Sequence, residues 1–157
     1  NNITFIPTDF LLLTNLTSLN LANNQLTLMY LEFAFITSLT SIVTDNNLWR
    51  SPHEDVMKRS TPEIFDYMSR VYEAHQTGIL DLTGRQLSAV TNDMALGTSM
   101  QTLKLDHNVI ELLTPEVSQL RVLEVLTLRH NKLRTLPWEI AQVVRLQHLD
   151  LGENRLM

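Results

Sequence analysis

Residues 16–26 read LTSLNLANNQL, and this stretch decides the fold. Leu19 and Leu21 are separated by one residue, so in an extended chain both side chains point to the same side. Asn24 follows three residues after Leu21, where the chain must turn away from that short strand. The same pattern of leucines and asparagine returns 23 residues later and again along the chain, and a fixed period of this length predicts stacked repeats.

The copies of the pattern share one asparagine position, which we call the asparagine ladder. An amide side chain has donors and an acceptor, so it can satisfy backbone groups of the turn that would otherwise be buried without partners. The copy that begins at Thr77 is degenerate, because Arg85 stands at the ladder position. The ladder consists of Asn1, Asn24, Asn47, Asn108, Asn131 and Asn154.

The second half of each repeat carries apolar residues 5, 9 and 12 positions after the ladder position, as in Leu113, Val117 and Leu120. This spacing of three to four residues predicts a short α-helix or 3₁₀ turn on the side opposite the strands. Pro115 and Pro137 fall near the start of two such turns, where a missing N–H costs little.

An insertion interrupts the period, because the copies that begin at Leu39 and Thr77 lie 38 residues apart instead of 23. Thr61 as N-cap and Pro62 as the first helical residue predict a helix from about Pro62 to His75. We therefore predict three parts of one continuous solenoid: a first repeat block over 1–60, an inserted helix over 61–76 and a second block over 77–157. The apolar stripe of the helix, expected to face the repeats, consists of Ile64, Tyr67, Met68 and Val71.

On these features the chain resembles the leucine-rich-repeat family over nearly its whole length. Residues 133–151, LRTLPWEIAQVVRLQHLDL, are similar to the short repeats of intracellular Ras-group proteins such as the Shoc-two scaffold and yeast adenylyl cyclase. The shared core is L-P-x-x-I, here Leu136, Pro137 and Ile140. Pattern and resemblance together predict an α/β right-handed solenoid (a horseshoe), with a concave parallel sheet and convex short helices.

Catalytic and cofactor motifs are missing from the sequence. It has no cysteine, and its four glycines form neither G-x-G-x-x-G nor G-x-x-x-x-G-K. Neither H-E-x-x-H nor G-x-S-x-G is present. We therefore predict no enzyme activity, no cofactor and no metal site.

Charge and hydropathy narrow the classes of partner. The formal net charge is −5, and the Lys and Arg residues are scattered, so a nucleic-acid surface is not expected. The most apolar stretches, at 10–13 and 31–36, are far shorter than the roughly 20 residues of a membrane helix, so membrane insertion is not expected either. A chain without cysteine suits a reducing compartment, and we predict a cytoplasmic location.

Equivalent positions of stacked repeats form columns on the concave face, and these columns hold the candidate binding residues. His107 and His130 share one column and are predicted to be neighbours about 5 Å apart. With Glu153 they could form a weak metal site or a proton switch, or they could be solvated histidines on a binding face. We expect the last, because two histidines and one loose carboxylate make an incomplete metal site. The candidate partner-binding residues are Asp45, Asp81, Lys104, Asp106, His107, Thr127, Arg129, His130, His148, Asp150 and Glu153.

Three functions fit this pattern. The first is recognition of a partner protein by the concave face, which is polar and varied as reversible binding requires. The second is a regulatory repeat domain of a larger signalling enzyme, a kinase, GTPase or cyclase whose catalytic part lies outside this chain. The third is a secreted or surface receptor. Four large aromatic side chains are expected to serve as core or rim packing: Phe33, Phe35, Trp49 and Trp138.

The two ends of the chain lead to one more expectation. The sequence opens at a ladder asparagine and stops at Leu156 and Met157, before the convex half of the last repeat. Solenoids need polar caps on their terminal repeats. We expect a fragment of a longer array that self-associates through its exposed ends.

Overall fold

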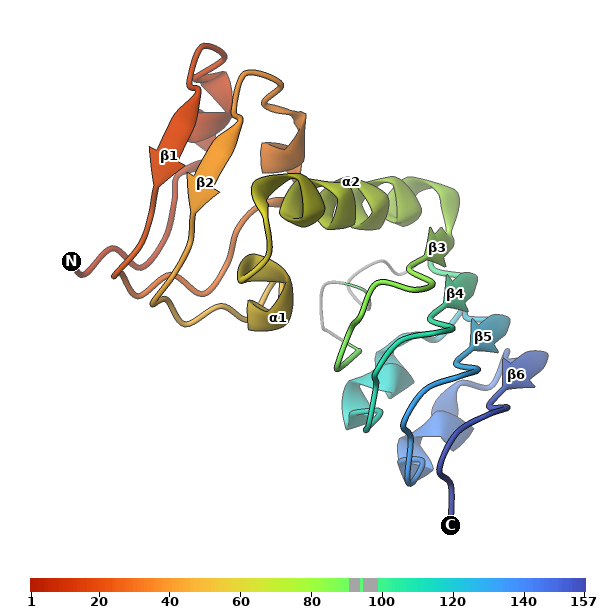
Figure 1. The fold of residues 1–157 in the computed structure, drawn as a ribbon. Helices are drawn as coiled ribbons and strands as arrows, with labels where there is room; N and C mark the ends of the chain where they lie inside the picture. Colours follow the sequence, from red (N-terminus) through yellow and green to blue (C-terminus); the bar gives the residue numbers. More distant parts are fainter. Residues whose placement is uncertain (91–93, 95–98) are drawn as a thin grey trace. The chain divides into compact units, whose positions relative to one another are not determined.

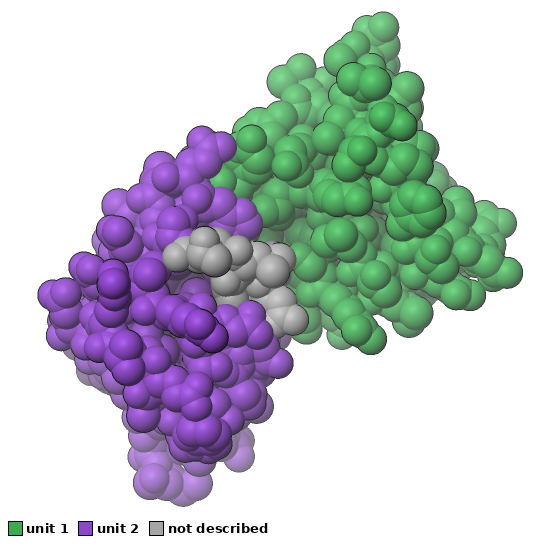
Figure 2. All heavy atoms as spheres, turned by 180° about the vertical axis from the view of Figure 1, so that it is seen from behind, with its two compact units in different colours: residues 1–72 green, residues 73–157 purple. Residues whose placement is uncertain are grey.

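The structure, a computed structural model, describes residues 1–90, 94 and 99–157. The chain divides into two compact units, Asn1–Tyr72 and Glu73–Met157, which Figure 2 shows in separate colours. Each unit has its own parallel sheet and its own set of buried leucines. That the two repeat blocks form one continuous solenoid stays a prediction.

Unit 1 contains two repeats and most of the insertion (Figure 1). Strands β1 (Ser18–Asn20) and β2 (Ser41–Val43) pair in parallel, with Leu19 opposite Ile42. The 3₁₀ helices η1 (Thr8–Leu12) and η2 (Leu31–Phe35) form the second halves of the repeats. Helices α1 (Glu54–Met57) and α2 (Thr61–Thr77) follow.

Unit 2 contains a sheet of four parallel strands in the order β3-β4-β5-β6 (Figure 1). These strands are β3 (Ile79–Asp81), β4 (Thr102–Lys104), β5 (Val125–Thr127) and β6 (His148–Asp150). The 3₁₀ helices η3 (Pro115–Gln119) and η4 (Trp138–Gln142) lie in the connections that follow β4 and β5. Parallel strands and short helices confirm the predicted α/β leucine-rich-repeat fold.

The predicted core positions are buried. The central leucine of the strand is 1% exposed in β3, 0% in β4 and 1% in β5. Leu113, Val117 and Leu120, from the second half of a repeat, are each at most 2% exposed. Both faces of a repeat therefore contribute to one apolar interior, which provides most of the stability because three-residue strands cannot stand alone.

The asparagine ladder makes the contacts that its position requires. The Nδ2 group of Asn131 donates to the carbonyl oxygens of Leu105 (2.9 Å) and Leu128 (3.0 Å), in the preceding repeat and in its own. Its Oδ1 accepts from the backbone N–H of Ile110 at 3.0 Å. The ladder residues at 47, 108 and 154 repeat this arrangement. Asn24 accepts from the N–H of Ile3 and donates to the carbonyl of Leu21 in its own repeat.

Polar contacts from the insertion satisfy groups at the end of the first block. Thr44 stands where other repeats carry an inward leucine, and its buried hydroxyl donates to the carbonyl of Met57 in α1. The hydroxyl of Thr61 in α2 accepts from the backbone N–H of Ile42 at 3.0 Å, so β2 finds a partner there without a further strand. The polar residue in the leucine pattern is therefore explained by the insertion that follows it.

The helix predicted over 62–75 is confirmed, with corrected ends and one addition. Its apolar stripe is buried, and the helix runs from Thr61 to Thr77. Ser60 occupies the N-cap position that we assigned to Thr61, because its backbone N–H donates to the carboxylate of Glu63 at 3.1 Å. The sequence reading missed α1, in which His53 is the N-cap.

The aromatic residues divide into two groups. Phe33 is fully buried and Trp49 is 7% exposed, as expected of core residues. Phe35 is 47% exposed and Trp138 is 71% exposed. Phe35 and Trp138 are therefore not core residues, and only the rim half of the expectation is left for them.

Candidate binding surface

The strand face of unit 2 consists of the outward side chains of β3 to β6 and of the turn after each strand. Parallel pairing aligns these side chains in rows across the sheet. One row consists of the last residue of each strand. In this row Lys104 lies between Asp81 and Thr127, and Thr127 lies beside Asp150. The register confirms the order of this row, while its role in binding stays a prediction.

Two carboxylates of this row are held by the backbone of the following turn. The Oδ1 atom of Asp81 accepts from the N–H of Thr83 at 3.1 Å, and that of Asp150 accepts from the N–H of Gly152 at 2.9 Å. Such bonds two residues ahead are the Asx turns that short acidic side chains favour. Lys104 places its ammonium 3.9 Å from the second oxygen of Asp81.

Asp106 links its own repeat to the next one. Its carboxylate accepts from the hydroxyl of Thr127 at 2.6 Å and from the backbone N–H of Arg129 at 2.7 Å. The guanidinium of Arg129 lies 3.6 Å from the carboxylate of Glu153, one repeat further on. Asp106 therefore contributes to the stacking of repeats in addition to the charge of the face.

His107 and His130 are stacked, as the repeat period predicted. Their ring centroids lie 4.4 Å apart with an interplanar angle of 21°. Both residues have positive φ, 55° and 54°, and Glu153 at the equivalent position has φ 54°. The left-handed turn directs these side chains outward, so all three are exposed. Among the residues that the structure describes, no three His, Asp or Glu side chains are grouped to hold a metal ion.

Not every predicted residue belongs to this face. Asp45 lies in unit 1, two residues after the end of β2, so it is not part of the strand face as defined for unit 2. His148 belongs to the strand face, but to another row, which consists of the first residue of each strand. There it begins β6 and lies beside Val125. The same row contains Thr102 and Ile79, and Ile79 is 57% exposed.

The sequence reading missed the apolar members of that row. Ile79 and Val125 occupy the position just before the first leucine of the strand, which the alternation of a strand directs outward. Aligning the repeats at this position, rather than only after the strand, would have found both residues.

Two lowered pKa values among the described residues lie outside the strand face. A hydrogen bond from the hydroxyl of Ser60 lowers the pKa of Glu63, and one from the hydroxyl of Thr114 lowers the pKa of Glu116. Both carboxylates lie at helix starts, where capping explains the shift. Neither gives a candidate acid or base for catalysis.

Comparisons with known proteins agree with this architecture. Residues 98–156 match a family described as "Leucine rich repeat", and residues 15–35 match a second family of that description. No curated protein matches the chain. Within residues 1–90, 94 and 99–157, no helix combines the length and apolar character that crossing a membrane requires.

Two solved structures are similar to this chain. A leucine-rich-repeat protein of Leptospira interrogans is 27% identical, with a TM-score of 0.50 over 99% of this chain and 42% of that chain. An internalin of Listeria monocytogenes is 19% identical, with a TM-score of 0.41 over 99% of this chain and 39% of that one. The chain therefore spans less than half the length of either protein. The family matches and the fold together support the leucine-rich-repeat family, and each of the two units has the leucine-rich-repeat fold of parallel strands and short helices.

Proposed function

We propose that the strand face of unit 2 binds a partner protein. The observation that supports this most is the alignment of exposed and half-buried polar and charged side chains in rows by four parallel strands. The face has more carboxylates than cations, so with neutral histidines its net charge is negative. It therefore suits a partner surface that carries basic groups. The carboxylates are Asp81, Asp106, Asp150 and Glu153, and the cations are Lys104 and Arg129.

The energetics of the face favour reversible binding. Exposed ion pairs such as Lys104 with Asp81 and Arg129 with Glu153 are each worth about 0–1 kcal/mol. A partner can replace them at small cost. Ile79 and Val125 add apolar area beside the charged rows, and an apolar centre with a polar rim is the usual composition of a protein interface.

Repeat type and location are part of the same proposal. The 23-residue period and the L-P-x-x-I core at Leu136, Pro137 and Ile140 support the short Ras-group type. A chain without cysteine fits the reducing conditions of the cytoplasm. We accordingly infer a cytoplasmic interaction module.

The test compares two matched substitutions. A tagged form of the protein captures partners from cells of its source, and each captured protein is purified and its Kd measured. We expect Ile79→Lys to weaken binding by about tenfold or more, because it disrupts the apolar part of the interface. Val144→Lys serves as the control and leaves Kd unchanged. Val144 is 84% exposed and lies on the side of the repeats that carries the 3₁₀ helices, which we call the helix side.

The opposite pattern of results would contradict the proposal. A partner that binds Ile79→Lys as tightly as the unchanged chain, but no longer binds Val144→Lys, uses the helix side instead. Thermal melts of both variants are compared first, so that a loss of binding is not confused with a loss of folding.

A further inference from the structure

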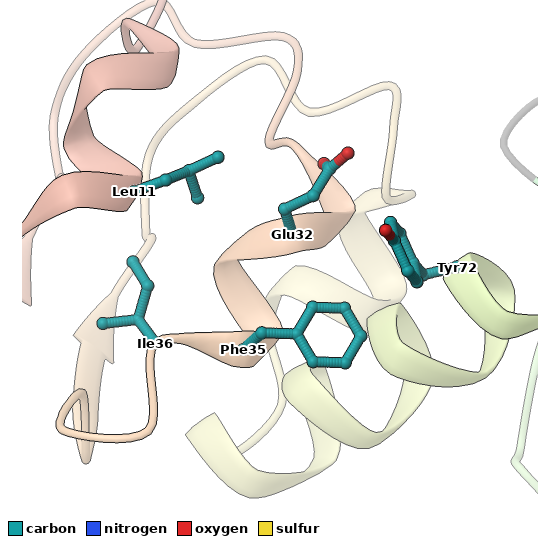
Figure 3. Close-up of a pocket in the computed structure, with 5 residues that line it drawn as sticks. All are labelled: Leu11, Glu32, Phe35, Ile36 and Tyr72. Carbon is teal, nitrogen blue, oxygen red and sulfur yellow. The ribbon is translucent and has the colours of Figure 1, made fainter. Parts of the chain in front are cut away.

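The helix side of unit 1 contains a groove that the strand face does not involve. Five residues line it, and all of them belong to unit 1: Leu11, Glu32, Phe35, Ile36 and Tyr72. Its volume is about 440 Å³, which lies in the range of pockets that hold small ligands or a few side chains. Figure 3 shows Leu11 of η1 and Tyr72 of α2 on opposite sides, with the residues of η2 between them.

Aromatic side chains form one wall of this groove. The rings of Phe35 and Tyr72 meet edge to face, with centroids 4.9 Å apart and an interplanar angle of 67°. Phe35 is nevertheless 47% exposed, while Ile36 is 6% exposed and continues into the core. The contact with α2 fixes Phe35 in place without covering it.

A comparison among the repeats shows that the apolar groove is specific to unit 1. Phe35 stands 11 residues after the ladder position, and Leu12, 76% exposed, stands at the same position one repeat earlier. In unit 2 this position holds Gln119 and Gln142. The fold therefore accepts glutamine there, and packing alone does not account for exposed Phe and Leu.

The corresponding groove of unit 2 has a different chemistry. It lies between η3 and η4 and is lined by two glutamines, Ser118, Val122, Val144 and the cation Arg121. In unit 1, Thr37 occupies the repeat position of Arg121. The groove of unit 1 is thus lined by aliphatic and aromatic side chains and one carboxylate, whereas four of the six side chains that line the groove of unit 2 are polar, one of them a cation.

Glu32 gives the groove of unit 1 its charge. Acidic residues occupy this position in every short helix, but the hydroxyl of Thr114 engages Glu116 in unit 2, whereas Tyr30 replaces that threonine in unit 1. The structure records no ion pair or hydrogen bond for the Glu32 side chain within the described ranges. Residues 1–49 include three acids and not one Lys or Arg, so cations from that part of the chain do not compete for Glu32.

We propose that this groove docks a short segment of a partner protein in which an arginine adjoins an aliphatic residue. The aliphatic side chain enters between Leu11 and Ile36 and buries apolar area against Phe35. The guanidinium pairs with Glu32 and lies against the rings of Phe35 or Tyr72, a contact that arginine favours. This docking site is independent of the strand face, and either proposal can fail without the other.

The experiment uses a defined peptide and the ¹⁵N-labelled chain. N-acetyl-Leu-Arg-Leu amide is titrated while amide chemical shifts are followed, with the citrulline analogue as a neutral probe of the same shape. We expect saturable shifts at the amides of Glu32, Phe35 and Tyr72. The arginine peptide should bind about two- to fivefold more tightly than the citrulline peptide, the range of one exposed ion pair.

Three variants assign the site. Phe35→Gln introduces the residue that unit 2 has at this position, so the fold is retained, and the saturable shifts should disappear. Glu32→Gln should bind both peptides equally. Glu139→Gln, at the same repeat position in η4, is the matched control and should keep the preference for arginine.

Each alternative result overturns the proposal. It is wrong if the unchanged chain gives no saturable shifts, if Phe35→Gln binds as the unchanged chain does, or if arginine and citrulline peptides bind equally. Shifts that disappear in Ile79→Lys but persist in Phe35→Gln would assign the peptide to the strand face.

Discussion

Each ladder asparagine from Asn24 onward satisfies backbone groups of two consecutive repeats. The carbonyl of Leu105 accepts from two such side chains, those of Asn108 (2.8 Å) and Asn131 (2.9 Å). A buried carbonyl or N–H that loses its partner pays the desolvation cost of that group. Where the strands end, the asparagine side chains therefore provide the hydrogen bonds between repeats that the backbone provides within the sheet.

Asn131→Leu should destabilise unit 2 by about 1–3 kcal/mol, since the backbone N–H of Ile110 loses its buried partner and the carbonyl of Leu128 loses one of its two asparagine donors. The measurement is chemical unfolding followed by circular dichroism. Asn131→Asp is the control that keeps the acceptor while removing the donors. An unfolding midpoint of Asn131→Leu equal to that of the unchanged chain would contradict the role of the ladder.

Arg85→Asn should be neutral or stabilising, by about 1 kcal/mol at most. The carbonyl of Leu82 accepts from the side chain of one ladder asparagine, Asn108, whereas the equivalent carbonyl of Leu105 accepts from two ladder asparagines. An asparagine at position 85 would provide the second donor to Leu82. A clear fall in the melting temperature of Arg85→Asn would show that Arg85 has contacts of greater value.

At the scale of elements, the repeats use very short pieces of structure. The strands contain three residues and the 3₁₀ helices five, so each is stable only against its neighbours. Helix α2 differs, because it has 17 residues and a capping box formed by Ser60 and Glu63. It is the one element among the described residues whose own ends can be tested separately.

Glu63→Gln should weaken the start of α2 in a pH-dependent way. Hydrogen bonding to Ser60 lowers the pKa of Glu63 below 4.5, so the charged form stabilises the folded state at neutral pH. That contribution is present above the ordinary pKa and is lost as the pH falls through the lowered value. The unfolding free energies of Glu63→Gln and of the unchanged chain should differ most at neutral pH and converge in acid.

The control for this experiment is Glu73→Gln, an exposed position in the last turns of the same helix. The difference in unfolding free energy between Glu73→Gln and the unchanged chain should not follow the same pH profile. If the unfolding free energies of Glu63→Gln and of the unchanged chain differ by a constant amount from neutral to acid pH, the carboxylate has no capping role.

Elements were predictable from the sequence to different degrees. The period of 23 residues fixed the strands and the asparagine ladder, because every copy requires the same burial. Helix α1 could not be predicted, since four residues show no periodicity. The bonds from Asp106 to Thr127 and Arg129 could not be predicted either, because they depend on side-chain torsions rather than on register.

Exposure of the aromatic residues was predicted only in part. The expectation of core or rim packing did not separate buried Phe33 and Trp49 from exposed Phe35 and Trp138. Comparing repeats would have corrected it for Phe35, since Gln142 stands at the equivalent position. Position within the repeat therefore predicts burial better than residue type does.

At the scale of the whole molecule, two compact units share one chain. Thr44→Val removes a buried hydroxyl that donates to Met57 in unit 1, while Asn131→Leu acts in unit 2. Because repeats stabilise mainly their immediate neighbours, we expect each change to raise amide hydrogen exchange in its own unit. Mass spectrometry of peptides from β2 and from β5 measures the two effects. Equal loss of protection in both units for either variant would show that the chain unfolds as one cooperative body.

The ladder also has a consequence for how such a gene can change. The residue at position 108 accepts from the N–H of Leu87, and the residue at position 131 accepts from the N–H of Ile110, so each repeat offers its neighbour the same chemistry. An in-frame deletion of residues 108–130 would bring Asn131 opposite Leu87, so that the N–H groups bound by the ladder would again face an asparagine acceptor. Duplication of the same 23 codons would preserve the ladder in the same way. Unequal recombination can therefore shorten or lengthen the array in whole repeats, and its length can evolve faster than its architecture.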